Sequence, residues 1–143
     1  VFNLVKPSAD NKTISMEMEV PAHLQIFADK NMVNTVIRNL LLNAVKFTPR
    51  GGQVTITARK ADDKVEISVV DNGVGIRPEK LSKLFTIDSN IASQGTAGEE
   101  GTGLGLILCK EFIEKNNGII RVESRELHGS TFTVTLPSFF ISN

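Results

Sequence analysis

Three polar side chains interrupt a stretch rich in leucine and valine, NLLLNAVKFT at 39–48: Asn39, Asn43 and Lys46. In a helix, about 100° of rotation per residue places these three side chains within about 60° of each other on one wall. The neighbouring wall is apolar and consists of Val33, Val36, Ile37, Leu40, Ala44 and Phe47. At the edge of a core, amide oxygens can bind a hard metal ion such as Mg²⁺, and an ammonium can neutralise phosphate oxygens. An ordinary amphipathic helix with solvated polar residues would show the same pattern.

A carboxylate opens the second candidate segment, DNGVGI at 71–76. Side chains alternate along a strand, so Asp71 shares one face of the preceding strand with Val65, Ile67 and Val69. That face is apolar and should point to the core, which puts Asp71 at the end of a buried row. A buried, unpaired charge costs several kcal/mol, so Asp71 requires a partner, and a ligand amine would serve. Asp-Asn-Gly is also favourable turn chemistry, so a simple turn is the alternative.

The third candidate is the glycine-rich run GTGLGL at 101–106, which leads directly into a helix. Glycines let the backbone approach a phosphate closely, and a helix N-terminus offers free N–H groups and positive potential. The dinucleotide fingerprint does not fit, because it needs glycine at the position of Leu106 and a strand ahead of the run. A Walker A motif is excluded because Gly-Lys-Ser/Thr occurs nowhere in the chain. A glycine-rich turn without a ligand remains the alternative.

A serine near the end of the chain completes the set. Ser130 shares strand parity with Phe132, Val134 and Leu136, so its hydroxyl should also point to the core side. There it could stand beside Asp71.

The elements that must position these residues follow from the hydrophobic periodicity. Asp29 is placed to N-cap a helix that runs to about Thr48, where Pro49-Arg-Gly-Gly stops it. A short helix is predicted from Pro78 through Phe85, and a long one at 103–116, ended by Asn117-Gly118. Strands are predicted at 14–20, 24–28, 53–59, 64–71, 119–124 and 130–137. The pattern indicates an α+β two-layer sandwich, with a mixed, mostly antiparallel sheet and its helices on one face.

Length and composition limit the remaining possibilities. The 143 residues suffice for one domain, predicted at 1–137, with 138–143 as a tail or linker. Sixteen basic and sixteen acidic residues cancel, so no global field attracts nucleic acid or an acidic membrane. No apolar run approaches the roughly 20 residues that span a bilayer. The single cysteine, Cys109, fits a reducing compartment. The chain starts with valine, which is typical of a fragment.

In this order, the motifs resemble those of the catalytic and ATP-binding domain of two-component sensor histidine kinases. The stretch 39–48 resembles the N-box of that family, 71–76 its first glycine box, 101–106 its second, and Leu84-Phe85 the start of its F-box. The flanking sequences at 6–14 and 128–137 are also similar to that family, so the likeness covers nearly the whole chain. The resemblance implies the Bergerat fold, with ATP held between the helices under a lid at about 86–101.

The resemblance also implies roles for single residues. Asn43 would bind Mg²⁺, with Asn39 and Lys46 at the phosphates as the catalytic pair. Asp71 would accept a hydrogen bond from the adenine amine, assisted by Ser130. The remaining nucleotide contacts would come from Phe47, Gly73, Gly75, Ile76, Phe85, Gly101, Thr102, Gly103, Leu104, Gly105 and Leu106.

Other members of the same fold hydrolyse ATP, among them mismatch-repair ATPases, type II topoisomerases and heat-shock chaperones. Those families carry a glutamate where this chain has Asn39, and an amide cannot act as a general base. Phosphoryl transfer to a histidine is therefore favoured over hydrolysis. The run 85–90 lacks the second phenylalanine and the arginine usual in the F-box, and 86–101 contains no Lys or Arg. A non-catalytic ATP-binding scaffold is thus a further alternative, and in a kinase Lys46 and Lys83 would have to supply the missing charge.

The partners follow from the same resemblance. Neither His23 nor His128 lies in the pattern of the phosphorylated helix, so the acceptor histidine is expected on an upstream dimerisation hairpin of the parent protein. A response-regulator receiver domain would then take the phosphoryl group. We expect the fragment to be a monomer on the cytoplasmic side, without nucleic-acid or membrane contact of its own.

Overall fold

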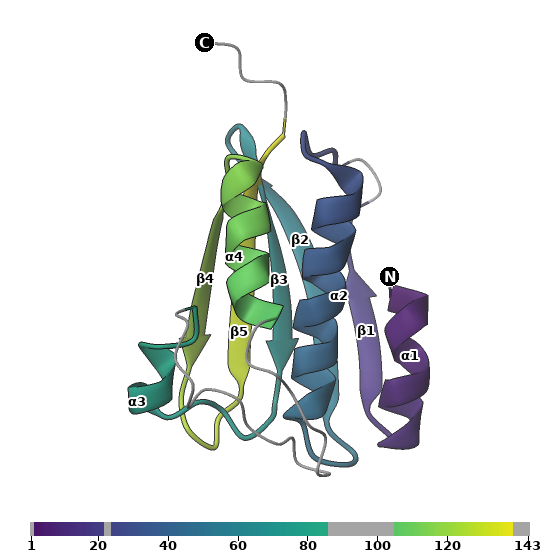
Figure 1. Cartoon of the computed structure of the whole chain (residues 1–143). Helices are drawn as coiled ribbons and strands as arrows, with labels where there is room; N and C mark the ends of the chain where they lie inside the picture. The colour runs from purple at the N-terminus through teal and green to yellow at the C-terminus, as the bar shows by residue number, and fades with distance from the viewer. Residues whose placement is uncertain (1, 22–23, 86–104, 139–143) are drawn as a thin grey trace.

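A computed structural model describes residues 2–21, 24–85 and 105–138. One mixed sheet is packed on one face by helices (Figure 1). In chain order the elements are α1 (Phe2–Asn11), β1 (Ser15–Glu19), α2 (Lys30–Lys46), β2 (Gln53–Ala61), β3 (Lys64–Asp71), α3 (Pro78–Leu81), α4 (Gly105–Lys115), β4 (Ile119–Ser124) and β5 (Ser130–Pro137). The strand order is β1-β2-β3-β5-β4, in which only the β1–β2 pair is parallel. The predicted α+β sandwich with a mostly antiparallel sheet is confirmed.

The core lies between the sheet and α1, α2 and α4. Helix α2 is the central helix. Five of the six residues of its predicted apolar wall, Val33, Val36, Ile37, Leu40 and Ala44, are buried, and so are Leu41 and Val45, while the sixth, Phe47, is half-buried. Asp29 caps this helix by accepting a hydrogen bond from the Met32 N–H at 2.9 Å. At the other end α2 stops at Lys46, and the Phe47 N–H still bonds to the Asn43 carbonyl. The helix that carries the three polar residues is therefore fixed at both ends.

No element was predicted for residues 2–11, where the structure has helix α1 with Pro7 inside it, a position that proline disfavours. Tertiary packing outweighs that local preference. Val5 and Ala9, four residues apart, are fully buried against the core, with Ile14 just beyond the helix. In Figure 1, α1 lies at the edge of the helical layer beside β1.

A buried lysine joins α1 to the end of α2. The Lys12 side chain is 5% exposed, and its Nζ donates to the carbonyls of Val45 at 2.9 Å and Lys46 at 3.2 Å. These carbonyls belong to the last turn of α2, where intrahelical donors run out and the helix dipole favours a cation. Lys12 thereby holds the turn from which Lys46 and Phe47 project.

We expect Lys12→Met to lower the free energy of unfolding by about 2–3 kcal/mol, because it removes charge-assisted hydrogen bonds from buried carbonyls. Denaturant titration measures this change. Lys110→Met serves as the control, since Lys110 is exposed on α4 and its substitution should change stability by less than about 0.5 kcal/mol. Equal effects of the two substitutions would contradict a capping role for Lys12.

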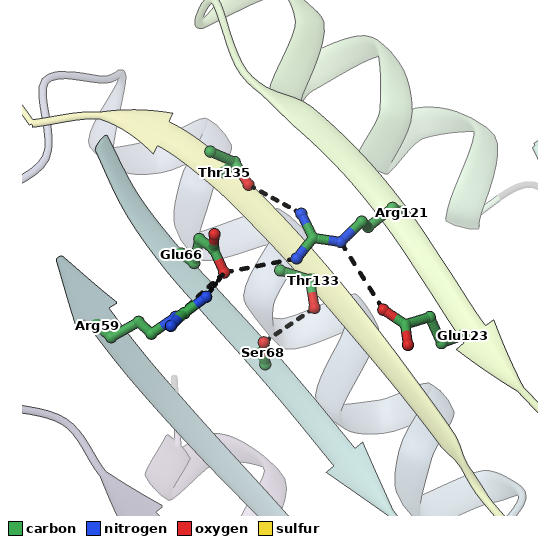
Figure 2. A network of polar contacts seen from close by, with 7 residues as sticks. All are labelled: Arg59, Glu66, Ser68, Arg121, Glu123, Thr133 and Thr135. Carbon is green, nitrogen blue, oxygen red and sulfur yellow. Dashed lines mark hydrogen bonds and ion pairs between the residues drawn. The ribbon is translucent and has the colours of Figure 1, made fainter. Parts of the chain in front are cut away.

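The face of the sheet away from the helices carries a polar network (Figure 2). Arg59 of β2 donates to Glu66 of β3 at 3.1 Å, and Arg121 of β4 approaches the same carboxylate oxygen at 3.5 Å. The hydrogen bond from Arg59 is the main reason that the pKa of Glu66 lies below its ordinary value. The hydroxyls of Ser68 and Thr133 lie 2.9 Å apart between β3 and β5. These contacts connect four strands and support the register that leaves Asp71 on the opposite, core side.

Two predicted elements differ from the structure. The helix that begins at Pro78 ends at Leu81 rather than Phe85, and residues 82–85 form turns. The run 24–28 is not a strand, and one backbone hydrogen bond, from Phe27 N–H to Pro137 O at 2.8 Å, ties it to the end of β5. None of the helices in the described part of the chain has the length and apolar character needed to cross a bilayer.

Candidate functional site

Asp71 ends β3 on the core side of the sheet, as its parity predicts. It is 7% exposed and stands directly opposite Ser130 of β5. Its Oδ1 accepts a hydrogen bond from the Gly73 N–H at 2.8 Å. Burial raises the pKa of the Asp71 carboxyl above its ordinary value, while hydrogen bonds from the backbone N–H groups of Gly73 and Ser130 act in the opposite direction. None of the ion pairs between described residues includes Asp71.

The partner that Asp71 was expected to need is thus supplied in part by the backbone of the chain itself. Because no cation of a described residue pairs with this carboxylate, an incoming amine could still improve its solvation.

A pair of serine hydroxyls lies next to this carboxylate. Ser130 is 8% exposed, and its Oγ is 2.8 Å from the Oγ of Ser124 at the end of β4. The same Ser124 oxygen accepts from the Ile76 N–H at 2.9 Å and donates to the Gly129 carbonyl at 2.9 Å. One side chain therefore links the loop that follows Asp71 to the β4–β5 hairpin.

The end of α2 and the β4–β5 hairpin hold the loop at 71–76 from two sides. The Val74 N–H donates to the Phe47 carbonyl at 3.1 Å, and the Leu127 N–H donates to the Val74 carbonyl at 2.7 Å. A Cβ added to Gly73 would lie 2.3 Å from the Phe47 oxygen. The proposed adenine-binding loop and the proposed phosphate-binding helix are therefore in direct contact.

Gly75 is required by the chain's own packing. Its φ is +72°, and an added Cβ would lie 2.0 Å from the carbonyl oxygen of Arg125. A ligand was the expected reason for Gly73 and Gly75, but contacts within the chain already explain both glycines.

We expect Gly75→Ala to destabilise the fold by about 1–3 kcal/mol more than Gly51→Ala does. Gly51 has a similar φ of +81° but nothing within 4 Å of an added Cβ, so its substitution measures the cost of the left-handed backbone alone. Urea unfolding of both variants gives the difference. Equal losses of stability would mean that the loop moves aside without cost.

The polar wall of α2 lies at the edge of the core, and Asn39, Asn43 and Lys46 are all half-buried. The Asn39 side chain faces α4, since its Oδ1 would lie 3.6 Å from a Cβ built on Gly105. Asn39 also forms a hydrogen bond with the buried thiol of Cys109, whose pKa burial raises to about 12. The Lys46 ammonium lies 4.9 Å from the centroid of the Phe47 ring, within the range of a cation–π contact.

Several other predicted nucleotide contacts pack against the core in the structure. Ile76, Phe85 and Leu106 are partly buried hydrophobic residues of this kind. Gly105 is the first residue of α4. The predicted lid at 86–101 and the predicted contacts Gly101, Thr102, Gly103 and Leu104 lie outside the described residues.

Two polar residues of this region were not predicted from the sequence. Ser124 shares strand parity with Ile120 and Val122, both partly buried against the core, so the alternation that predicts a core-side Ser130 also predicts a core-side Ser124. Lys12 gave no such signal, because its burial depends on helix α1, for which no element was predicted.

Two other features are separate from these residues. A hollow of about 320 Å³ lies at the N-terminal end of α2 and the C-terminal end of α4, lined by Phe27, Ala28, Asp29, Lys115, Asn116 and Asn117. It contains none of the predicted site residues. Within the described ranges, no group of three or more His, Cys, Asp or Glu side chains could hold a metal ion.

The sequence of the chain is similar to those of known proteins. Residues 28–139 match the family model described as histidine kinase-, DNA gyrase B- and HSP90-like ATPase. The sensor-like histidine kinase SenX3 of Mycobacterium tuberculosis is 35% identical over 133 residues, which are 93% of this chain but 32% of that protein. The chain therefore spans about a third of the length of this relative.

Two solved structures extend the likeness to the fold. The nucleotide-free catalytic domain of the histidine kinase ThkA superimposes with a TM-score of 0.81 at 29% identity, over 96% of this chain and 88% of that one. Full-length ShkA in complex with AMPPNP gives a TM-score of 0.80 at 29% identity, over 99% of this chain and 29% of that one.

Proposed function

Because the chain belongs to the family of histidine kinase-, DNA gyrase B- and HSP90-like ATPases, we propose that it binds Mg-ATP and transfers the γ-phosphoryl group to a histidine. The acceptor is a histidine on the dimerisation hairpin of its parent sensor kinase, from which the group passes to a response-regulator aspartate. The observation that carries this proposal is Asp71, a buried carboxylate opposite Ser130 whose described hydrogen-bond donors are backbone N–H groups.

Asp71 recognises the base in this proposal. Its Oδ1 is held by the Gly73 N–H, and the carboxylate accepts a further hydrogen bond from the adenine amine. Guanine presents a carbonyl oxygen at that position, which a carboxylate repels. Sites built around such a hydrogen bond can reject the wrong partner by up to about 10⁴-fold.

The polar wall of α2 binds the phosphates. Lys46 and the N-terminal end of α4 beside Asn39 contribute positive potential there. Asn43 fits Mg²⁺, because an amide oxygen is a hard ligand and protein-bound Mg²⁺ takes its remaining ligands largely from phosphates and water. When bound, the metal neutralises charge on the transferring group.

A histidine is a better acceptor than water at this site. Asn39 occupies the polar wall, where its amide can position a phosphate but cannot take a proton from water. A neutral imidazole nitrogen is itself a nucleophile, so it can attack the γ-phosphorus while the bond to the ADP oxygen breaks. The absent base would therefore slow hydrolysis without preventing transfer.

Calorimetric titration of the chain with ATP and GTP, each with and without Mg²⁺, tests the first half of the proposal. Binding of ATP in the range of about 1–100 μM, with GTP much weaker, is the expected result. Incubation with Mg-ATP and a supplied histidine hairpin tests the second half, and phosphohistidine should form faster than free phosphate. ATP binding without phosphohistidine would favour a non-catalytic scaffold, while rapid phosphate release would favour an ATPase. Binding of neither nucleotide would refute the proposal for this chain.

A further inference from the structure

We propose that Ser124 is a positioning residue for base specificity, because it makes Ser130 a hydrogen-bond acceptor toward the bound base. This inference rests on the proposed nucleotide site and adds a residue that does not itself touch the nucleotide. It would explain how the chain favours a purine with an amine at position 6 over one with a carbonyl oxygen there.

The contacts of the Ser124 hydroxyl use all of its hydrogen-bonding capacity. A serine hydroxyl offers one proton and two acceptor lone pairs. The Ser124 Oγ has three neighbours at hydrogen-bonding distance, namely the Ile76 nitrogen at 2.9 Å, the Gly129 carbonyl oxygen at 2.9 Å and the Ser130 Oγ at 2.8 Å. The Ile76 N–H can only donate, and the Gly129 carbonyl can only accept.

These fixed partners determine where the serine protons lie. Two oxygens 2.9 Å apart repel unless a proton lies between them, and the carbonyl of Gly129 has none to give, so the Ser124 proton points to Gly129. The proton in the 2.8 Å contact between the two hydroxyls must then come from Ser130. Ser130 consequently donates to Ser124 and keeps its lone pairs for other groups.

Ser130 stands directly opposite Asp71, so its lone pairs lie beside the acceptor oxygens of the carboxylate. An ionised carboxylate has only acceptor atoms, and a Ser130 whose proton is already committed also offers only lone pairs. This part of the site therefore accepts hydrogen bonds and suits an amine, directly or through a water that donates. A purine with a carbonyl oxygen at position 6 finds no donor from either side chain.

Calorimetry with ATP and inosine triphosphate tests the inference on the whole chain. Inosine triphosphate carries a carbonyl oxygen at position 6 and has no amine at position 2, so it isolates the group in question. We expect Ser124→Ala to reduce the preference for ATP over inosine triphosphate by about 10-fold, which corresponds to about 1.4 kcal/mol. The released Ser130 hydroxyl can then rotate and donate to the carbonyl oxygen. In the background of Ser130→Ala, the same change at Ser124 should have no effect on the preference.

The control is a second serine that also pairs with a hydroxyl across two strands. Ser68 lies 2.9 Å from Thr133 on the open face, and Ser68→Ala should leave the preference unchanged. Ser124→Cys provides a second variant of similar size if the alanine variant does not fold, since a thiol is a weak donor and acceptor and should give the same direction of change.

If the role of Ser124 is purely structural, its substitution would weaken the binding of both nucleotides by the same factor and leave the ratio of their affinities unchanged. That result would overturn the inference while the proposed function stands. A ratio that falls equally with and without the Ser130 hydroxyl would overturn it as well. Failure of the unmodified chain to bind ATP would instead overturn the proposed function and this inference with it.

Discussion

Asp71→Asn should weaken ATP binding by about 10²-fold or more while leaving the nucleotide-free chain at least as stable as the unmodified one. The Gly73 N–H holds the Oδ1 atom at 2.8 Å, so the asparagine carbonyl would take that position. Its amide nitrogen would then replace the second carboxylate oxygen, and two donors would face each other when the adenine amine arrives. A site that loses a matched hydrogen bond in this way discriminates strongly against its former ligand. Calorimetric titration with Mg-ATP measures the loss.

The stability half of this prediction follows from the direction of the pKa change. Burial raises the pKa of Asp71 in the folded chain above its ordinary value of 3.8, so the folded state binds this proton more tightly than the unfolded state does. The resulting contribution to stability is fully present below the unfolded pKa and is lost as the pH rises through the folded pKa. At neutral pH the buried charge therefore opposes folding, and a neutral asparagine removes that cost. Thermal unfolding at about pH 7 should show an unchanged or higher Tm for the variant. A clear drop in Tm together with the loss of binding would mean that Asp71 is primarily structural.

Sequence patterns predicted the elements with strong periodicity. The cap at Asp29, the apolar wall from Val33 to Phe47 and the predicted stop after Thr48 located α2 to within two residues. Alternation placed Asp71 and Ser130 on the core side, and the register confirms that they face each other. Local rules failed where distant contacts decide the conformation. Helix α1 accommodates Pro7 because Val5 and Ala9 are buried against the core.

The features of the candidate site likewise fall into those that the sequence pattern predicted and those that it could not predict. Periodicity predicted which side chains share a wall, because that depends only on spacing along one element. It could not predict that the Phe47 carbonyl would meet Val74, or that Gly75 would pack under Arg125, since those contacts join segments far apart in the chain. The glycines illustrate the difference, because their residue type suggested a ligand and their surroundings show that the chain itself requires them.

Asn43→Ala should strongly slow the Mg²⁺-dependent phosphoryl transfer and leave the base site intact. An amide oxygen at this position on α2 is the proposed protein ligand, and losing a positioned electrostatic group at a transferring phosphoryl typically costs about 10²–10³ in rate. We expect transfer to a supplied histidine hairpin to slow by that factor. ATP affinity in the absence of Mg²⁺ should change by less than about 3-fold, because Asp71 and the loop at 71–76 are untouched.

Asn34→Ala is the matched control for this experiment, since it makes the same chemical change on the same helix. Asn34 precedes Asn43 by nine residues, which places it about 180° around the helix axis, and it is exposed. Its substitution should change neither transfer nor binding. Equal losses in the two variants would point to a weakened helix rather than a lost metal ligand. Unchanged Mg²⁺ dependence in Asn43→Ala would mean that the metal is held by the phosphates and by other groups of the chain.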